Sequence, residues 1–188
     1  IYYKTDGQRG STRAMRDFHN LFVKRRLIDG VSPKGGTLID LAVGKAGDLS
    51  KWTNAELGLV LGIDISRDNL ENRLDGACTR FLKYEEKFPR CPQCLFAQGD
   101  ATQNIHSGMG LFTQTGKRTV GAVLGRGGRD KAKLGKAVYG AYGKGRAGFD
   151  VTSMQFALHY VWETHQTLQQ FIVNVTQLTK VGGCFIGT

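Results

Sequence analysis

Three short apolar runs, each ending at or beside an aspartate, most constrain what this chain can fold into. The runs and their aspartates are residues 37–41 with Asp40, 58–65 with Asp64, and 95–100 with Asp100. Stretches with helical periodicity separate them. Strands that alternate with helices predict a parallel sheet with helices on both faces, and ligands bind such sheets at the carboxyl ends of the strands. We therefore expect an α/β fold with a ligand site near these aspartates.

Apolar periodicity places the other elements. They are helices over residues 11–28, 48–55, 66–81 and 168–178, and strands over residues 149–154 and 184–187. Ser66 is the expected N-cap of the third helix, whose apolar face includes Leu70 and Leu74. Gly182 and Gly183 are expected to cap the last helix.

The turn after the first strand limits the choice of ligand. It contains Gly44, so the backbone can approach a ligand closely, and Asp64 follows twenty residues later. An acid at that position accepts hydrogen bonds from both ribose hydroxyls, which fits an NAD enzyme or a methyltransferase. The turn reads AVGKAG rather than GxGxxG, and Asp48 lies where a pyrophosphate would dock. A carboxylate repels pyrophosphate but can face a methionyl ammonium, so S-adenosylmethionine fits better.

Positive charge is concentrated in one segment. The net charge of +10 suits a polyanionic partner. Residues 116–148 hold nine Lys or Arg, one acid and ten glycines, so we expect a basic, glycine-rich surface loop or insertion over about 113–148. It either tracks RNA phosphates or is a flexible solvated insertion, because its aromatic residues are limited to Tyr139 and Tyr142.

Other features argue for a reduced, metal-free protein without a membrane partner. No apolar run approaches the roughly 18 residues that cross a membrane. Cys91 and Cys94 have zinc-knuckle spacing, but no second ligand pair follows, so we interpret them as reduced thiols. The chain begins at Ile1 and ends at Thr188 just after a strand-like run, which predicts a fragment of a longer polypeptide.

Four stretches resemble the mRNA cap guanine-N7 methyltransferase family, closest to the forms in large DNA viruses. FHNLFVK at residues 18–24, followed by LI, resembles the family's N-terminal helix. IDLAVGKAGDLSKW at 39–52 resembles its LDLGCGKGGDLLKW turn, FDVTSMQFALHY at 149–160 its FDxxSxQFxxHY strand and pocket, and GGCFIGT at 182–188 its GGxFIGT. The resemblance implies a Rossmann-like class I methyltransferase domain over residues 1–188, with the C-terminal strands missing.

The resemblance also implies a role for each matching position. Lys24 would pair with the methionyl carboxylate, Asp48 and the backbone of residues 40–42 would hold the amino group, and Asp64 would bind the ribose. The implied cofactor residues are Lys24, Asp40, Ala42, Gly44, Asp48, Asp64, Asp100 (for the adenine amine) and Gln155 (for the methyl-donor pocket). The implied cap-guanine residues are Phe156, His159 and Tyr160. Without the resemblance, Lys24 is by default a solvated charge, and His159 and Tyr160 fit satisfied core residues.

Two departures from the family pattern affect what is expected. Ala42 and Ala46 stand where the family has glycine, which would crowd the cofactor slightly. The chain also stops before later strands that supply a guanine-reading glutamate, so this stretch alone is not expected to be fully active.

The implied reaction needs no catalytic acid or base, because guanine N7 carries a free lone pair at neutral pH. We therefore expect positioning to dominate, a contribution of roughly 7–11 kcal/mol. Fusion or association with guanylyltransferase and triphosphatase domains is expected, in the nucleus or, for a viral source, in the host cytoplasm, a virus factory or a virion. The alternatives are a methyltransferase acting on another RNA position or a small molecule, and a non-catalytic RNA-binding module of the same fold.

Overall fold

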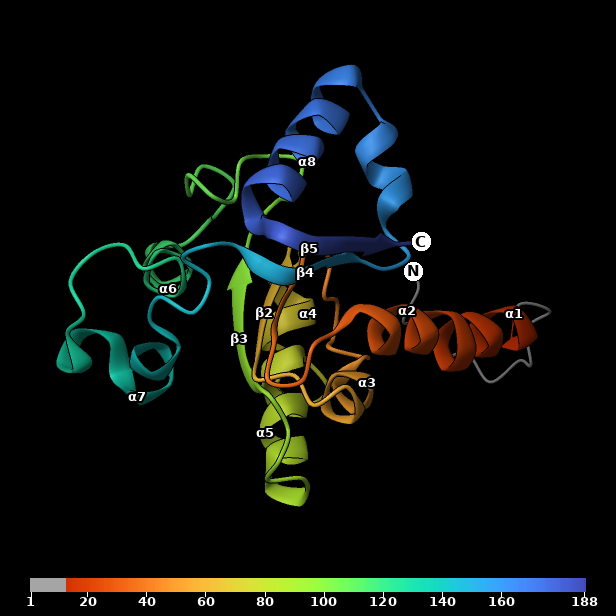
Figure 1. Cartoon of the computed structure of the whole chain (residues 1–188), viewed down its shortest axis with the longest axis horizontal. Coiled ribbons are helices and arrows are strands. Elements are labelled where there is room, and N and C mark those ends of the chain that lie inside the picture. Colours follow the sequence, from red (N-terminus) through yellow and green to blue (C-terminus); the bar gives the residue numbers. More distant parts are fainter. Residues whose placement is uncertain (1–12) are drawn as a thin grey trace.

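A five-stranded, wholly parallel sheet forms the centre of the molecule (Figure 1). The computed structural model describes residues 13–188, so the expected helix start at residue 11 lies outside the described residues. The strands are β1 Thr37–Asp40, β2 Leu59–Asp64, β3 Gln93–Gln98, β4 Phe149–Met154 and β5 Thr179–Gly187. Their order, β3-β2-β1-β4-β5, reverses direction between β1 and β4. A ligand crevice is expected at that reversal, beyond the carboxyl ends of the strands.

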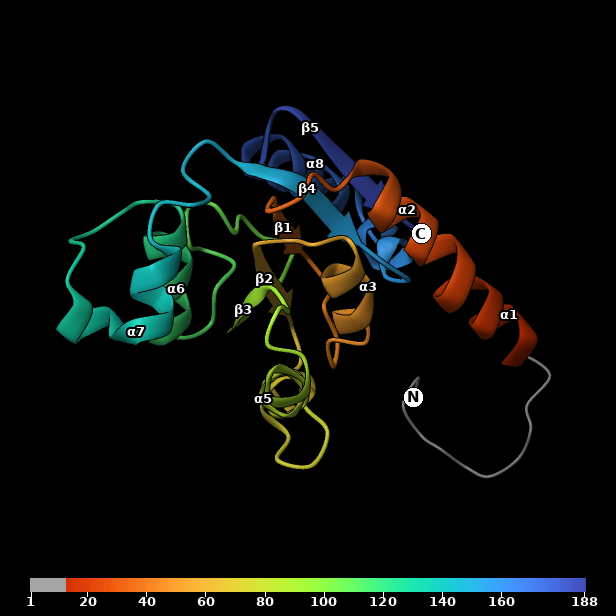
Figure 2. The same cartoon turned by 60° about the horizontal axis from the view of Figure 1, so that its bottom comes forward.

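Helices cover both faces of the sheet, which confirms the expected α/β class (Figure 2). On one face lie α2 Lys24–Val31, α3 Leu49–Asn54, α4 Arg67–Glu71 and α5 Ala77–Lys87. On the other lie α6 Gln114–Val123, α7 Lys131–Ala141 and α8 His165–Leu178. Trp52 on the first face and Phe149 facing the second are almost fully buried. All six residues of β2 are buried, as expected of a strand covered on both sides.

The N-terminal helix is longer than expected and contains a π-helical segment. It runs through α1 Arg13–Asp17, η1 Phe18–Val23 and α2 without a break. Ile28 is completely buried, whereas the apolar residues Phe18, Leu21 and Phe22 of the same helix are more than half exposed. The π-helical turn directly precedes Lys24, and such turns are frequent at functional sites.

The helix predicted over residues 66–81 is two helices. Ser66 is the N-cap of α4, as expected, and its Oγ accepts a hydrogen bond from Asn69 N at 3.2 Å. Asn72 then leaves the helical conformation, and its Oδ1 accepts a hydrogen bond from Leu74 N. Leu74, predicted on the apolar face, is 82% exposed. The prediction was wrong because a side-chain-bonded turn separates α4 from α5.

The glycine-rich segment contains the helices α6 and α7, so the prediction of a surface loop was wrong, whereas the alternative of an insertion stays a prediction. Residues 114–123 form α6, which buries Val120 and Val123 against the sheet. β3 and β4 are parallel and not adjacent, so the chain between them must cross a face of the sheet, usually as a helix. Glycine assists this packing, since a Cβ on Gly116 would lie 3.4 Å from the Cβ of Ala97 on β3.

The last helix ends differently from the prediction. Its C-cap is Thr179, whose N–H donates to Val175 O. Gly182 and Gly183 lie inside β5, at a register shift where β5 contains more residues than β4. Within the part of the chain that the structure describes, no helix has the length and apolar character needed to cross a membrane.

Candidate functional site

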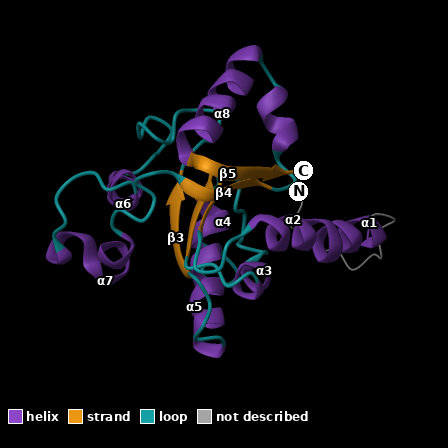
Figure 3. Ribbon diagram, viewed as in Figure 1, coloured by secondary structure: helices purple, strands orange, loops and turns teal. Residues whose placement is uncertain are grey.

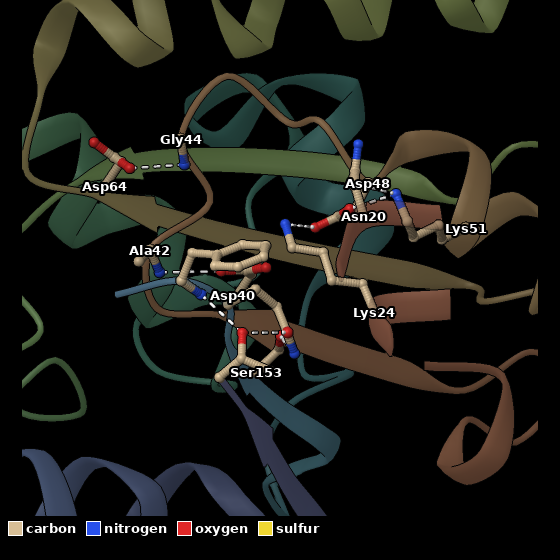
Figure 4. Close-up of polar contacts among 12 residues, drawn as sticks. Asn20, Lys24, Asp40, Ala42, Gly44, Asp48, Lys51, Asp64 and Ser153 are labelled. Atoms are coloured by element: carbon tan, nitrogen blue, oxygen red, sulfur yellow. Dashed lines mark hydrogen bonds and ion pairs between the residues drawn. The ribbon is translucent and has the colours of Figure 1, made fainter. Parts of the chain in front are cut away.

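The polar residues predicted from the strand ends meet beyond the carboxyl ends of β1, β2 and β4 (Figure 4). In this view Asp40 lies between Asp64 on one side and a group of Lys24, Asp48 and Lys51 on the other. The loop that joins them, residues 41–48, is called the β1 turn below.

Asp40 is a buried acid at the end of β1. It is 2% exposed, and its Oδ1 accepts a hydrogen bond from Ala42 N at 3.0 Å. Burial raises the pKa of Asp40 from 3.8 to about 7, against the lowering effect of that hydrogen bond. The negative charges of Asp48 and Asp64 raise it further, and the positive charge of Lys24 lowers it. A cation that enters the site would stabilise the ionised form of such a carboxyl group strongly.

The β1 turn brings backbone N–H groups toward the strand ends. Gly44 has φ +56°, a conformation that glycine adopts without steric cost. Ala46 has φ +53°, at a position where the resembling motif carries glycine. Val43 N donates to Ile63 O at 2.9 Å, and Gly44 N donates to Asp64 Oδ2 at 2.7 Å, so the turn is bound to β2.

Asp64 organises the turn from the end of β2. Besides Gly44 N, it accepts hydrogen bonds at Oδ1 from Ser66 N at 2.9 Å and Asn69 Nδ2 at 3.1 Å. A carboxylate has about four acceptor positions, so three donors leave room for one more. The acid is 6% exposed and held in one orientation, as a ribose-binding group needs to be.

Asp48 forms ion pairs with two lysines. Lys24 Nζ lies 3.0 Å from Oδ2 and Lys51 Nζ lies 2.7 Å from Oδ1, and all three side chains are largely buried. Burial alone would raise the pKa of Asp48, but Lys24 and Lys51 outweigh it, so the pKa lies below its usual value. Lys51 also donates to Asn20 Oδ1 at 3.1 Å. Lys51 and Asn20 were missed from the sequence, although Lys51 lies three residues after Asp48 on the next helical turn.

Gln155 and Phe156 directly follow the end of β4. Gln155 is buried, donates to Ser153 Oγ at 3.3 Å, and accepts a hydrogen bond from Thr188 Oγ1 at 3.3 Å. Phe156 has φ +59°, a strained backbone for an aromatic residue. Strain of this kind persists where the surroundings enforce it, often at functional sites.

The ring of Phe156 connects the N-terminal helix to this edge of the sheet. Lys24 Nζ lies 5.0 Å from its centroid, and the His19 ring meets it edge-on at 5.0 Å. The buried Nδ1 of His19 has no hydrogen-bond partner among residues 13–188. His19, like Lys51 and Asn20, was given no role at this site from the sequence.

Three predicted residues lie apart from this group. Asp100 follows β3, and its Oδ1 accepts hydrogen bonds from Thr102 N at 2.8 Å and Thr102 Oγ1 at 2.7 Å. His159 and Tyr160 lie in η2 Leu158–Trp162 with their rings 4.0 Å apart. Both are exposed, Tyr160 by 66%, so they are not core residues.

The cysteines do not assemble a metal site in the part of the chain that the structure covers. No group of three or more His, Cys, Asp or Glu side chains comes together among residues 13–188. Cys94 is buried, which raises the pKa of its thiol, and its Sγ donates to Pro92 O at 3.5 Å.

Sequence comparison relates the chain to one enzyme family. The model of the mRNA (guanine-N(7))-methyltransferase domain matches residues 130–188. The mRNA cap guanine-N(7) methyltransferase 1 of Arabidopsis thaliana is 30% identical over 169 residues, 90% of this chain and 37% of that protein. Its namesake in Oryza sativa is 29% identical over 175 residues, again 90% of this chain and 37% of that protein.

A viral relative and a solved structure complete the comparison. The probable mRNA-capping enzyme of Acanthamoeba polyphaga mimivirus is 26% identical over 174 residues, 93% of this chain and 14% of that protein. An S-adenosylmethionine-dependent methyltransferase from Clostridium acetobutylicum superposes with a TM-score of 0.51 at 12% identity, covering 93% of this chain and 54% of that one. The structural likeness shows the Rossmann-like methyltransferase fold. The chain spans little more than a third of its plant relatives, and over about nine tenths of its own length its sequence is similar to mRNA cap guanine-N7 methyltransferases.

Proposed function

We propose that this chain is the cofactor-binding part of an enzyme that transfers a methyl group from S-adenosylmethionine to N7 of the guanosine cap of mRNA. The observation that carries the proposal is the pair of buried acids on either side of the β1 turn, Asp40 at the end of β1 and Asp48 at the N-cap of α3. Asp40 and Asp48 are 2% and 5% exposed, and they lie around a tight turn joined to a ribose-type acid, Asp64.

The charges of the site fit this cofactor. S-adenosylmethionine supplies a methyl group on a positively charged sulfur, and its methionyl end carries an ammonium and a carboxylate. Asp40 has a pKa raised mainly by burial, so an entering cation stabilises its ionised form. Lys24 has three donors and uses one on Asp48, which leaves donors for a carboxylate. Asp64 would hold the ribose and Asp100 the adenine amine.

The cap guanine fits the exposed rings after β4. Phe156, His159 and Tyr160 come from one short segment, and the last two are open to solvent. Flat rings of this kind bind a base by stacking, worth roughly 1–3 kcal/mol per base. Guanine N7 needs no deprotonation, so these residues act by holding N7 in line with the methyl group. Fusion or association with guanylyltransferase and triphosphatase domains belongs to the same proposal.

The proposal is tested by methyl transfer from labelled S-adenosylmethionine to GpppG-ended RNA, using the full polypeptide that contains this chain. We expect labelled N7-methylguanosine at the cap. Asp64→Ala should abolish transfer by removing cofactor binding. His159→Ala should lower kcat/KM at least roughly tenfold while cofactor binding, measured by calorimetry, stays unchanged, because His159 is exposed and only stacks.

Two outcomes would contradict this assignment. Cofactor binding without cap methylation would indicate a methyltransferase with another substrate. Salt-sensitive RNA binding without cofactor binding would indicate a non-catalytic RNA-binding module. Arg73→Gln is the control variant, since Arg73 is exposed in the turn between α4 and α5 and is none of the residues proposed for cofactor or cap binding.

A further inference from the structure

A basic pocket lies between α6 and α7, outside the site described above. It is a cavity of about 760 Å³, and its charged lining consists of Lys117, Arg118, Arg126 and Lys133. None of the residues proposed for cofactor or cap binding contributes to it. Figures 1 and 2 show α6 and α7 at one end of the sheet, with α1 and α2 at the other.

The positive charges of the pocket are nearly uncompensated. Among residues 13–188, no carboxylate forms an ion pair with Lys117, Arg118 or Arg126. Lys133 lies 3.8 Å from Asp130, whose Oδ1 accepts a hydrogen bond from Ala132 N at the start of α7. Four cations around one cavity with a single shared acid create a positive potential that attracts an anion.

Glycines leave the floor of the pocket open. Gly121, Gly127 and Gly128 line it, and a Cβ on any of them would meet nothing within 4 Å. An anion can therefore approach the backbone closely at these positions, as phosphates do at other glycine-rich segments. Gly116 in the same helix is needed for packing on β3, whereas Gly121 is not.

Aromatic side chains hold the loop that bears Arg126 and the glycines. Tyr142 Oη donates to Gly127 O at 2.6 Å, and the guanidinium of Arg129 lies 4.8 Å from the ring of Tyr139 and 5.8 Å from that of Tyr142. These contacts connect the loop to the end of α7. The pocket is thus formed by a packed loop rather than by an unsupported chain of basic residues.

The pocket is also joined to the edge of the sheet that leads to the cofactor site. Phe112 N, just before α6, donates to Gln98 O at the end of β3, two residues before Asp100. Burial, and after it the charge of Arg126, lowers the pKa of His106 in the same loop. The loop of residues 99–112 therefore connects the start of α6 to the end of β3 beside Asp100.

We propose that this pocket binds the phosphodiester backbone of RNA and forms a second docking surface beside the cofactor site. Phosphate is favoured over protein carboxylates because the lining combines bidentate arginines with open backbone, a combination that suits a tetrahedral anion. The identification of this RNA as the body of a capped transcript rests on the function proposed above. The binding of RNA phosphates by the pocket is independent of that function.

The test measures binding of an uncapped, single-stranded RNA of roughly 12 nucleotides to the full polypeptide by fluorescence anisotropy at several salt concentrations. The pocket variant is Lys117→Gln with Arg126→Gln. Losing two phosphate contacts should lower the slope of log K against log salt by about 1.4 and weaken binding roughly tenfold at 0.1 M salt. The matched control, Arg73→Gln with Arg80→Gln, removes the same charge from exposed positions near α5 and should change neither quantity.

A second variant distinguishes RNA binding in the pocket from attraction of RNA by the overall positive charge of the protein. Gly121→Glu places an acid where a Cβ meets nothing, so it should fold and should abolish binding at 0.1 M salt, whereas Gly121→Gln should retain most of it. Equal binding by the pocket and control variants would overturn the proposal. So would binding of polyglutamate as tight as that of RNA, which would indicate an acidic protein partner.

The cap dinucleotide GpppG distinguishes the two proposals. It has no RNA body, so its methylation should be the same in the pocket variant and the wild type, while the KM for capped RNA rises in the variant. If no methylation occurs at all, the cap assignment fails while the binding of uncapped RNA still tests the pocket.

Discussion

At the scale of single residues, the site depends on acids that the fold buries. Asp40, Asp48 and Asp64 each lie within a few per cent of full burial, but their surroundings differ. Asp48 has two lysine partners, and Asp64 accepts three hydrogen bonds. Asp40 has one hydrogen bond from Ala42 N and a pKa of about 7. Asp40 is therefore the residue whose charge depends on what occupies the site.

The first prediction concerns stability against pH. The folded protein holds a proton on Asp40 up to about pH 7, whereas the unfolded chain releases it near 3.8. The free energy of unfolding should therefore fall as pH rises from about 4 to about 7, and stay lower above that. Asp40→Asn removes this cost, so it should be more stable than the wild type at pH 8, by up to roughly 4 kcal/mol, and equal to it near pH 4.

Urea denaturation at pH 4, 6 and 8 measures the effect, with Asp29→Asn as the control because Asp29 is exposed. Asparagine keeps the oxygen that accepts from Ala42 N, so the turn should be preserved. The same variant should bind S-adenosylmethionine more weakly. A stability difference that does not change with pH would show that the charge of Asp40 is not the cause.

At the scale of elements, the two glycines of α6 have different roles. A Cβ on Gly116 would lie 3.0 Å from Thr113 Oγ1 and 3.4 Å from Ala97 Cβ, so Gly116 allows the helix to approach β3. Gly121 has no such contact. The same residue type thus permits packing at one position, whereas at the other it has no packing role and weakens the helix.

This difference gives the second prediction. Gly121→Ala should raise the free energy of unfolding by roughly 0.5–1 kcal/mol, because alanine has the higher helix propensity and meets nothing. Gly116→Ala should gain less or lose stability, because its Cβ crowds Thr113 and Ala97. Chemical denaturation measures the free energy of unfolding of the two variants. An equal increase in both would contradict the role assigned to Gly116.

At the scale of the whole molecule, a buried asparagine connects α8 to the loop that follows β3. Asn174 is fully buried, its Oδ1 accepts from Ile105 N at 2.8 Å, and its Nδ2 donates to Ala101 O at 2.8 Å and Gln103 O at 2.7 Å. The loop held in this way begins at Asp100. Asn174 thus joins two segments about seventy residues apart in the chain, and a hydrogen bond from Asn104 Nδ2 to Gln177 Oε1 at 3.1 Å joins them a second time.

The third prediction follows from these bonds. Asn174→Ala leaves the buried Ile105 N–H and Ala101 carbonyl, and the partly buried Gln103 carbonyl, without this partner, so the free energy of unfolding should fall by roughly 3 kcal/mol. Cofactor affinity should fall as well, because the loop carrying Asp100 loses its attachment. Thr176→Ala, at an exposed position on the same helix, is the control for denaturation and cofactor titration. Unchanged affinity in folded Asn174→Ala would show that the loop is held by other contacts.

Local patterns in the sequence determined much of this protein. Each expected strand forms, and Asp40, Asp64 and Asp100 lie at or beside the carboxyl ends of β1, β2 and β3, because burial on both faces of a sheet requires continuous apolar runs. The family motifs located the β1 turn and the segment after β4. Patterns of this kind depend on neighbours along the chain, so a sequence is sufficient to find them.

Only the tertiary structure decided the partners of these residues. The ion pairs of Asp48 with Lys24 and Lys51, and the edge-on contact of His19 with Phe156, join segments that the fold brings together. Composition was misleading in the glycine-rich segment, because a crossover helix can pack through small residues instead of large ones. In α8 the apolar Ile172 is half exposed and the polar Asn174 is buried, because three hydrogen bonds offset the cost of burying an amide. Burial and pairing are properties of the assembled molecule, and no periodicity along the chain encodes them.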